Sequence, residues 1–148
     1  MALCKKAEQY LKDAGWKPKH EKDINIYTKG LELEGYTINN YAKDFLREFG
    51  GLEAKQPAFR VPNEFDKLHF DPLKASAQIY RERVETYEER TGESLVVVGE
   101  AYNEHLILMI SDSGKMYGAY DNYLTLLGRN WTEALNSMYQ CEQTDEIK

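Results

Sequence analysis

The sequence predicts an α+β fold: a mostly antiparallel sheet with a C-terminal strand meander, backed by about four helices. Apolar residues recur at helical spacing in several stretches, and residues 95–128 hold short apolar runs separated by turn residues. The order is helices, two strands, a helix, a meander and a last helix, which is typical of α+β proteins. We expect the 148 residues to form one domain, 1–148, with a core that needs no metal or disulfide.

Two helices are predicted in the first third of the chain. The first runs from about Ala2 to Ala14 and is ended by Gly15. The second fits Thr37 to Phe49, with Thr37 as its N-cap. We expect Gly50 to take the left-handed position that ends this helix. The intervening residues 17–35 are ambiguous, although INIYT alternates well enough for a short strand.

Two more helices carry end signals. One begins at the capping residue Asp71, has Pro72 in its first turn and stops at Gly92. The last opens at Asn130, with Glu133 three residues later as in a capping box. The helix from 71 to 92 has a predicted buried stripe of Leu73, Ala77, Tyr80, Val84 and Tyr87.

The strands are predicted from shorter signals. LEAKQPAFRV contains a proline, so we expect an edge strand or a bulge, and KLHF follows as a second short strand. LVVVGEA and HLILMI are continuous apolar runs, which indicates cover on both faces. SDSG is a predicted hairpin turn before KMYGAY, and NYLTLLG is a further extended piece or a turn.

The net charge of −6 is unevenly distributed. Residues 1–90 carry equal numbers of acidic and basic side chains, so the whole excess lies in residues 91–148. This half lacks the basic stripe that direct nucleic-acid binding requires, whereas an acidic field would steer a basic partner. Plain solubility charge is the alternative explanation. The nine acids are Glu93, Glu100, Glu104, Asp112, Asp121, Glu133, Glu142, Asp145 and Glu146.

No residue is nominated as catalytic, cofactor-binding or metal-binding. No serine lies in G-x-S-x-G, and SDSGK lacks the first glycine of a phosphate-binding loop. His20, His69 and His105 are expected to be structural or exposed, since His69 with Asp71 gives at most two ligands. Cys4 and Cys141 are expected to be free thiols in a reducing cytoplasm, with a disulfide between them as the alternative. No stretch is apolar for long enough to span a membrane, and no secretory signal is expected.

The eleven tyrosines suggest a surface for a partner protein, because interfaces are enriched in tyrosine. Several fall in the acidic meander. The alternative is that they are amphipathic residues along the edge of the sheet. The expected partner-binding residues are Glu100, Glu104, Asp112, Tyr117, Tyr120 and Asp121.

Five segments in order resemble the SUKH superfamily, most closely its third subgroup, whose bacterial members are immunity proteins of polymorphic toxin systems. They are LKDAGW (11–16), FLREFGGL (45–52), LHFDP (68–72), LVVVGEAYNEHLILMISDSGKMYG (95–118) and LTLLGRNWTEAL (124–135). One departure is Val98, before Gly99, where many relatives are expected to have proline.

The resemblance implies an α+β fold without catalysis or cofactor, and a cytoplasmic antitoxin. Its partner would be the C-terminal domain of a cognate toxin, often a nuclease, and a basic nuclease would complement the acidic half of this chain. The oligomeric state is left open. The alternatives are a regulatory interaction module of the same superfamily without a toxin, and an unrecognised hydrolase.

Overall fold

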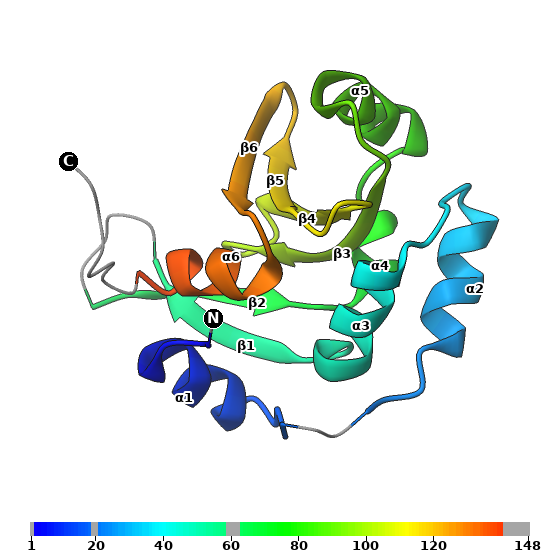
Figure 1. Cartoon of the computed structure of the whole chain (residues 1–148). Helices are drawn as coiled ribbons and strands as arrows, with labels where there is room; N and C mark the ends of the chain where they lie inside the picture. The colour runs from blue at the N-terminus through cyan, green and yellow to red at the C-terminus, as the bar shows by residue number, and fades with distance from the viewer. Residues whose placement is uncertain (1, 19–20, 59–62, 141–148) are drawn as a thin grey trace.

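A six-stranded antiparallel sheet with helices around it forms the structure, a computed structural model that describes residues 2–18, 21–58 and 63–140. The strands follow one another across the sheet in chain order. In Figure 1 the sheet curls, so that β5 and β6 rise away from β1 and β2, with α1 beside β1 and α5 beside the far end of the meander. The predicted α+β class and antiparallel sheet are therefore confirmed.

The six strands correspond to the predicted strand segments. The apolar runs form β3 and β4, which are buried along their whole length, and SDSG supplies the turn between β4 and β5. Pro57 lies on the edge strand β1, where a missing N–H costs no ladder bond. The strands are β1 (Glu53–Pro57), β2 (Phe65–His69), β3 (Leu95–Ala101), β4 (Leu106–Ser111), β5 (Met116–Tyr120) and β6 (Tyr123–Gly128).

The described residues hold six helices, more than the expected four. The additions are a helix in the ambiguous segment and a division of the helix predicted from Asp71 to Gly92. None of these helices is both long and apolar enough to span a membrane. They are α1 (Lys5–Asp13), α2 (Asn25–Leu33), α3 (Asn40–Phe49), α4 (Pro72–Ser76), α5 (Arg81–Thr91) and α6 (Trp131–Met138).

The beginning of α1 is tied to α6. Asn136 accepts a hydrogen bond from the Cys4 backbone N–H at 2.8 Å and donates one to the Ala2 carbonyl at 3.1 Å. The Cys4 sulfur caps α1 and is also disulfide-bonded, so the expectation of a free thiol is wrong for this residue. Cys141, the second cysteine of the chain, lies outside the described residues.

The segment INIYT is helical, not extended. It alternates over only five residues, whereas Ile24, Tyr27 and Leu31 form a longer stripe at helical spacing, and Ile24 and Leu31 are buried. Gly30 lies inside α2 because α4 packs closely there: a Cβ at this position would lie 2.3 Å from the Leu73 side chain. Tertiary packing therefore outweighs the low helix propensity of glycine.

The backbone conformations of the two glycines after α3 differ from the prediction. Gly50 has φ −55° and ψ 134°, so the left-handed assignment was wrong, and Gly51 has the positive φ, +84°. Gly50 is instead required by contact, because a Cβ there would lie 2.5 Å from the Leu46 carbonyl oxygen. The N-cap of α3 is Asn39, not Thr37, since its side chain accepts from the Ala42 N–H at 2.8 Å.

The chain from Asp71 to Gly92 bends between α4 and α5. As predicted, Asp71 caps α4 and Gly92 ends α5, and Gly92 does so in a left-handed conformation. The buried stripe was only partly right, because Ala77 and Tyr80 are exposed. Leu73 packs on α2, whereas Tyr87 reaches the turn between β5 and β6. A single straight helix could not make both contacts.

The last helix begins as predicted. The Asn130 side chain accepts from the Glu133 N–H at 2.8 Å, and the Glu133 carboxylate accepts from the Arg129 N–H at 3.2 Å. One core continues from the helices to the sheet, with an aromatic centre in which Phe45 contacts Phe49, Phe70 and Trp131. Strand β3 is bulged between Val97 and Gly99, at the position where proline was expected.

Candidate partner-binding site

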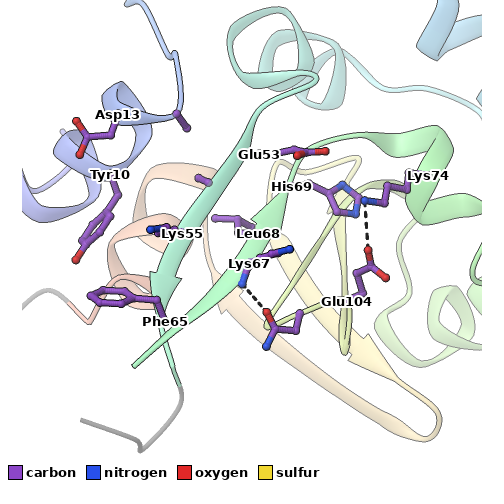
Figure 2. A pocket seen from close by; sticks show the side chains of 13 residues that line it. Tyr10, Asp13, Glu53, Lys55, Phe65, Lys67, Leu68, His69, Lys74 and Glu104 are labelled. Atoms are coloured by element: carbon purple, nitrogen blue, oxygen red, sulfur yellow. Dashed lines mark hydrogen bonds and ion pairs between the residues drawn. The ribbon is translucent and has the colours of Figure 1, made fainter. Parts of the chain in front are cut away.

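A groove with a volume of about 890 Å³ lies over the hairpin of β1 and β2. We call it the β1–β2 groove. Its floor is the strand pair, and its walls come from α1, α4 and the turn between β3 and β4 (Figure 2). Tyr10 and Phe65 form an aromatic end, with ring centroids 5.7 Å apart. Its charged residues are Asp13, Glu53, Lys55, Lys67, Lys74 and Glu104, and His69 lies among them.

Strand register decides which side chains meet in this groove. Glu53 on β1 pairs with His69 on β2, and His69 pairs with Glu100 on β3, so the three lie in one row across the sheet. Lys55 pairs with Lys67 and forms a second, basic row beside the first. The groove therefore has an acidic part and a basic part.

The close approach of β2 to β3 depends on Gly99. A Cβ at this position would lie 2.2 Å from the His69 carbonyl oxygen, so every other residue would push the strands apart. With glycine there, His69 Nε2 lies 2.8 Å from Glu100 Oε1. Both side chains are buried, at 6% and 1% exposure.

The tautomer of His69 follows from its second hydrogen bond. Nδ1 lies 3.1 Å from the Asp71 backbone nitrogen, which has only a proton to offer, so Nδ1 accepts. In the neutral ring the proton is then on Nε2, which donates to Glu100 Oε1. The second oxygen of Glu100, Oε2, is buried without a hydrogen-bond partner.

Two exposed side chains border this buried pair. Lys74 of α4 and Glu104 of the β3–β4 turn form an ion pair of 3.3 Å, and each is about half exposed. Figure 2 shows Lys74 next to the His69 ring, joined to Glu104 by a dashed line. Burial raises the pKa of Glu100, and the neighbouring Glu104 adds to this rise, while the hydrogen bond from His69 opposes it.

His69, Glu100 and Glu104 are close enough to be considered as metal ligands, because their ligating atoms lie within 4.8 Å of one another. The tautomer of His69 argues against this use. A metal on Nε2 would require the proton on Nδ1, where it would face the Asp71 N–H. We therefore interpret the cluster as a site for hydrogen-bond donors.

The structure brings two of the six predicted partner-binding residues to this groove. Glu104 lines it, and Glu100, which is not a lining residue, is buried against the lining residue His69. Tyr120 and Asp121 are exposed at the turn between β5 and β6, whereas Asp112 is exposed at the β4–β5 turn, at the opposite end of the strands. The six residues thus do not form one patch, and their role in binding stays a prediction.

Tyr117 is buried rather than presented to solvent. Its hydroxyl donates to Glu93 Oε2 at 2.8 Å, and burial together with this carboxylate raises the pKa of Tyr117 to about 12. For Glu93, burial acts to raise the pKa, but hydrogen bonds from Ser113, Tyr117 and Ser111 outweigh it and the net shift is downward. This network holds the start of β3 to the β4–β5 hairpin.

The turn between β5 and β6 presents an aromatic pair, and side chains of α5 hold this turn in place. The rings of Tyr120 and Tyr123 are 5.0 Å apart, and both are about half exposed. The Tyr87 hydroxyl of α5 donates to the Asp121 carbonyl at 2.6 Å, and Arg90 donates to the Asn122 carbonyl at 2.8 Å. Rigid, half-exposed tyrosines are typical anchors of protein interfaces.

Most of the described acids in residues 91–140 are engaged within the molecule. Glu93 pairs with Lys115, Glu104 with Lys74 and Glu133 with Arg129, while Glu100 contacts His69. Asp112 and Asp121 are exposed at two separate turns. The acidic excess of this segment is therefore less available to a partner than the charge count suggests.

Sequence reasoning did not select Glu53 or Lys74 for this site. Both are separated from Glu100 by 26 residues or more, and only the strand register and the position of α4 bring them together. The sequence offered one usable sign, which is Gly99 inside an apolar strand, since such glycines mark close backbone approach.

An antiparallel sheet backed by helices, with a charged groove on one hairpin, places this chain among small α+β proteins. The comparison with protein families is more specific than the fold class. The family model of the SUKH-3 immunity protein matches residues 4–140, and the chain belongs to this family. No curated protein and no solved structure matches the chain significantly.

Proposed function

We propose that this protein is an immunity protein that binds and neutralises the domain of a cognate toxin, without catalysing a reaction itself. The observation that carries the proposal is the match to the immunity family over nearly the whole chain. We further propose that the toxin is a basic nuclease and that the complex forms in the bacterial cytoplasm. The net charge of −6 supports a basic partner, because opposite charge speeds association.

The proposed contact residues are the exposed members of the predicted set, Glu104, Tyr120 and Asp121 at one end of the strands and Asp112 at the other, together with Tyr123. Tyr123 is added because its ring packs against that of Tyr120. Glu100 and Tyr117 are buried and would act beneath this surface. The carboxylates would steer the encounter, and the tyrosines would slow dissociation.

The test is co-expression with the variable C-terminal domain of the toxin encoded beside this gene. The immunity protein should restore growth and co-purify with the toxin domain. Changing Glu104, Asp112 and Asp121 to their amides should slow association roughly tenfold at low salt, and the difference should shrink above about 0.15 M salt. If growth stays arrested and no complex forms, the proposed function is wrong.

A matched control separates local steering from net charge. Glu21, Glu32 and Glu34 are exposed acids of the first 35 residues, outside the proposed surface, and their three amide substitutions change the net charge equally. If both triple variants slow association to the same extent, the acidic residues of the meander act only as general charge. The interface should then be sought on the helices.

A further inference from the structure

The unsatisfied oxygen of Glu100 marks a place where a donor is missing. Glu100 is 1% exposed, and only one of its two carboxylate oxygens has a partner, the Nε2 of His69. A buried carboxylate oxygen without a donor is costly, and native proteins rarely leave one unpaired. His69 cannot supply a second proton, because its Nδ1 accepts from Asp71.

The surroundings of this oxygen favour a cation. The Glu104 carboxylate lies within 4.8 Å of the Glu100 carboxylate, and Glu53 lies in the same row on the far side of His69. Lys74 is the ammonium group paired with Glu104. All three carboxylates contribute to raising the pKa of Lys74, Glu104 most strongly through its hydrogen bond. Three carboxylates against one ammonium leave an excess of two negative charges, which favours a further cation.

The basic row limits what fits. Lys55 and Lys67 line the next part of the same groove, so a second cation would be repelled there. Asp13, the remaining charged residue of the lining, accepts a hydrogen bond from Gln9. The site therefore suits a single basic group that enters from the side of Lys74.

We propose that the acidic part of the β1–β2 groove binds one arginine side chain of the toxin. The planar guanidinium donates to Glu100 Oε2 and to the Glu104 carboxylate, and it displaces Lys74 from Glu104. Arginine fits better than lysine because its fork bridges two nearby carboxylates and is more weakly hydrated. The Lys74–Glu104 pair is half exposed, so its displacement costs little.

This inference rests on the proposed function, because it names the chemistry of the toxin surface that the groove recognises. Its first test does not need the toxin. The probe is N-acetyl-arginine methylamide, titrated to tens of millimolar against the full chain, with the His69 ring followed by NMR. Matched titrations use the lysine and citrulline analogues.

We expect the arginine probe to shift the His69 resonances in a saturable manner, with an affinity at least threefold higher than the lysine probe. The citrulline probe, which lacks the charge, should have no saturable effect. Glu100→Gln and Glu104→Gln should each weaken arginine binding at least threefold. Glu8→Gln, which breaks an exposed ion pair on α1, is the control and should change nothing.

Lys74→Ala gives a prediction of opposite sign. Because Lys74 competes for Glu104, its removal should tighten arginine binding, whereas a merely structural role of the pair would weaken it. Equal responses to the arginine and citrulline probes would overturn the proposal. So would a saturable shift of His69 with micromolar Zn²⁺ or Mn²⁺, because it would make the cluster a metal site.

The toxin domain provides the second test. Glu100→Gln combined with Glu104→Gln should raise its dissociation rate at least tenfold, with unchanged NMR spectra elsewhere as evidence of an intact fold. If the parent binds the toxin and the double variant binds it equally well, the arginine site is wrong while the proposed function stands. If the parent does not bind the toxin, the proposed function fails and the arginine titration still decides the site.

Discussion

At the scale of single residues, glycine is required at the two positions after α3 for different physical reasons. Gly51 is in the left-handed region, where residues with a Cβ are strained. Gly50 has an ordinary backbone but no room for a Cβ, because the Leu46 carbonyl oxygen and the Tyr27 ring occupy that space. Glycine at a helix end therefore indicates either conformation or contact, and the sequence pattern does not distinguish the two.

This difference predicts the effect of alanine at Gly50. The new Cβ would force the backbone at the end of α3 to shift, and we expect a loss of about 1–3 kcal/mol in the free energy of unfolding. Urea denaturation measures it. The control is Gly92→Ala at the end of α5, where φ is +73° and nothing lies within 4 Å.

The control should show only the backbone cost, about 1 kcal/mol. We expect the loss at Gly50 to exceed the loss at Gly92. An equal or smaller loss at Gly50 would mean that the contact with Leu46 is relieved without cost, and that the conformation of the joint differs from the one described.

At the scale of elements, α5 and the β5–β6 hairpin form one unit. Their connection consists of polar side chains of α5 that hold the backbone of a two-residue turn. Because Tyr120 and Tyr123 flank this turn, the same bonds fix the aromatic pair that we propose for toxin binding. An anchor held in place before binding loses less entropy when the partner arrives.

Tyr87→Phe tests this brace. The change removes the hydroxyl that donates to the Asp121 carbonyl and leaves the buried ring in place. We expect a loss of about 1 kcal/mol in unfolding free energy, and faster hydrogen exchange of the backbone amides in the turn. Tyr80→Phe is the matched control, because Tyr80 is 84% exposed.

The control should change stability by less than about 0.5 kcal/mol. If Tyr87→Phe leaves both stability and exchange at the turn unchanged, α5 does not support the hairpin. The tyrosine pair would then have to be held by the strands alone.

At the scale of the whole molecule, the buried carboxylate of Glu100 and the partly buried carboxylate of Glu93 affect stability in opposite directions. The pKa of Glu100 is raised by burial above its ordinary value of 4.5, whereas that of Glu93 is lowered by its hydrogen bonds despite burial. The folded state therefore binds an extra proton at Glu100 just above pH 4.5 and releases one at Glu93 just below it. Stability follows these proton counts.

The prediction concerns the pH dependence of unfolding free energy. As pH rises from 4.5 through the raised pKa of Glu100, the parent loses stability, because the folded state holds this proton more tightly than the unfolded chain does. Glu100→Gln removes this loss and preserves the acceptor for His69. Its stability relative to the parent should therefore increase with pH above 4.5, as measured by urea denaturation between pH 4 and 8.

Glu93→Gln is the comparison and should behave in the opposite way. Stability from Glu93 is present above pH 4.5 and is lost as pH falls through its lowered pKa, so this variant should be weaker than the parent at neutral pH. If the unfolding free energies of the parent and of Glu100→Gln change with pH in parallel, the pKa of Glu100 is not raised in the folded state.

The class of the fold and most of its elements could be predicted from the sequence alone. Local signals were enough: the caps at Asp71 and Asn130, the stop at Gly92, the turn SDSG and the apolar runs of β3 and β4 all lie where expected. These features depend on neighbours a few residues away, which a sequence pattern contains. The family resemblance, carried by segments of the same kind, was also confirmed.

Three features could not be predicted, because they follow from tertiary contacts: the helix at Asn25–Leu33, the different roles of Gly50 and Gly51, and the composition of the site. Glu53, His69 and Glu100 meet because of strand register, and Lys74 joins them because α4 lies beside β3. Burial then turns Glu100 from an expected surface acid into a carboxylate with one unpaired oxygen. Register and burial depend on contacts between distant segments, and no short stretch of sequence contains them.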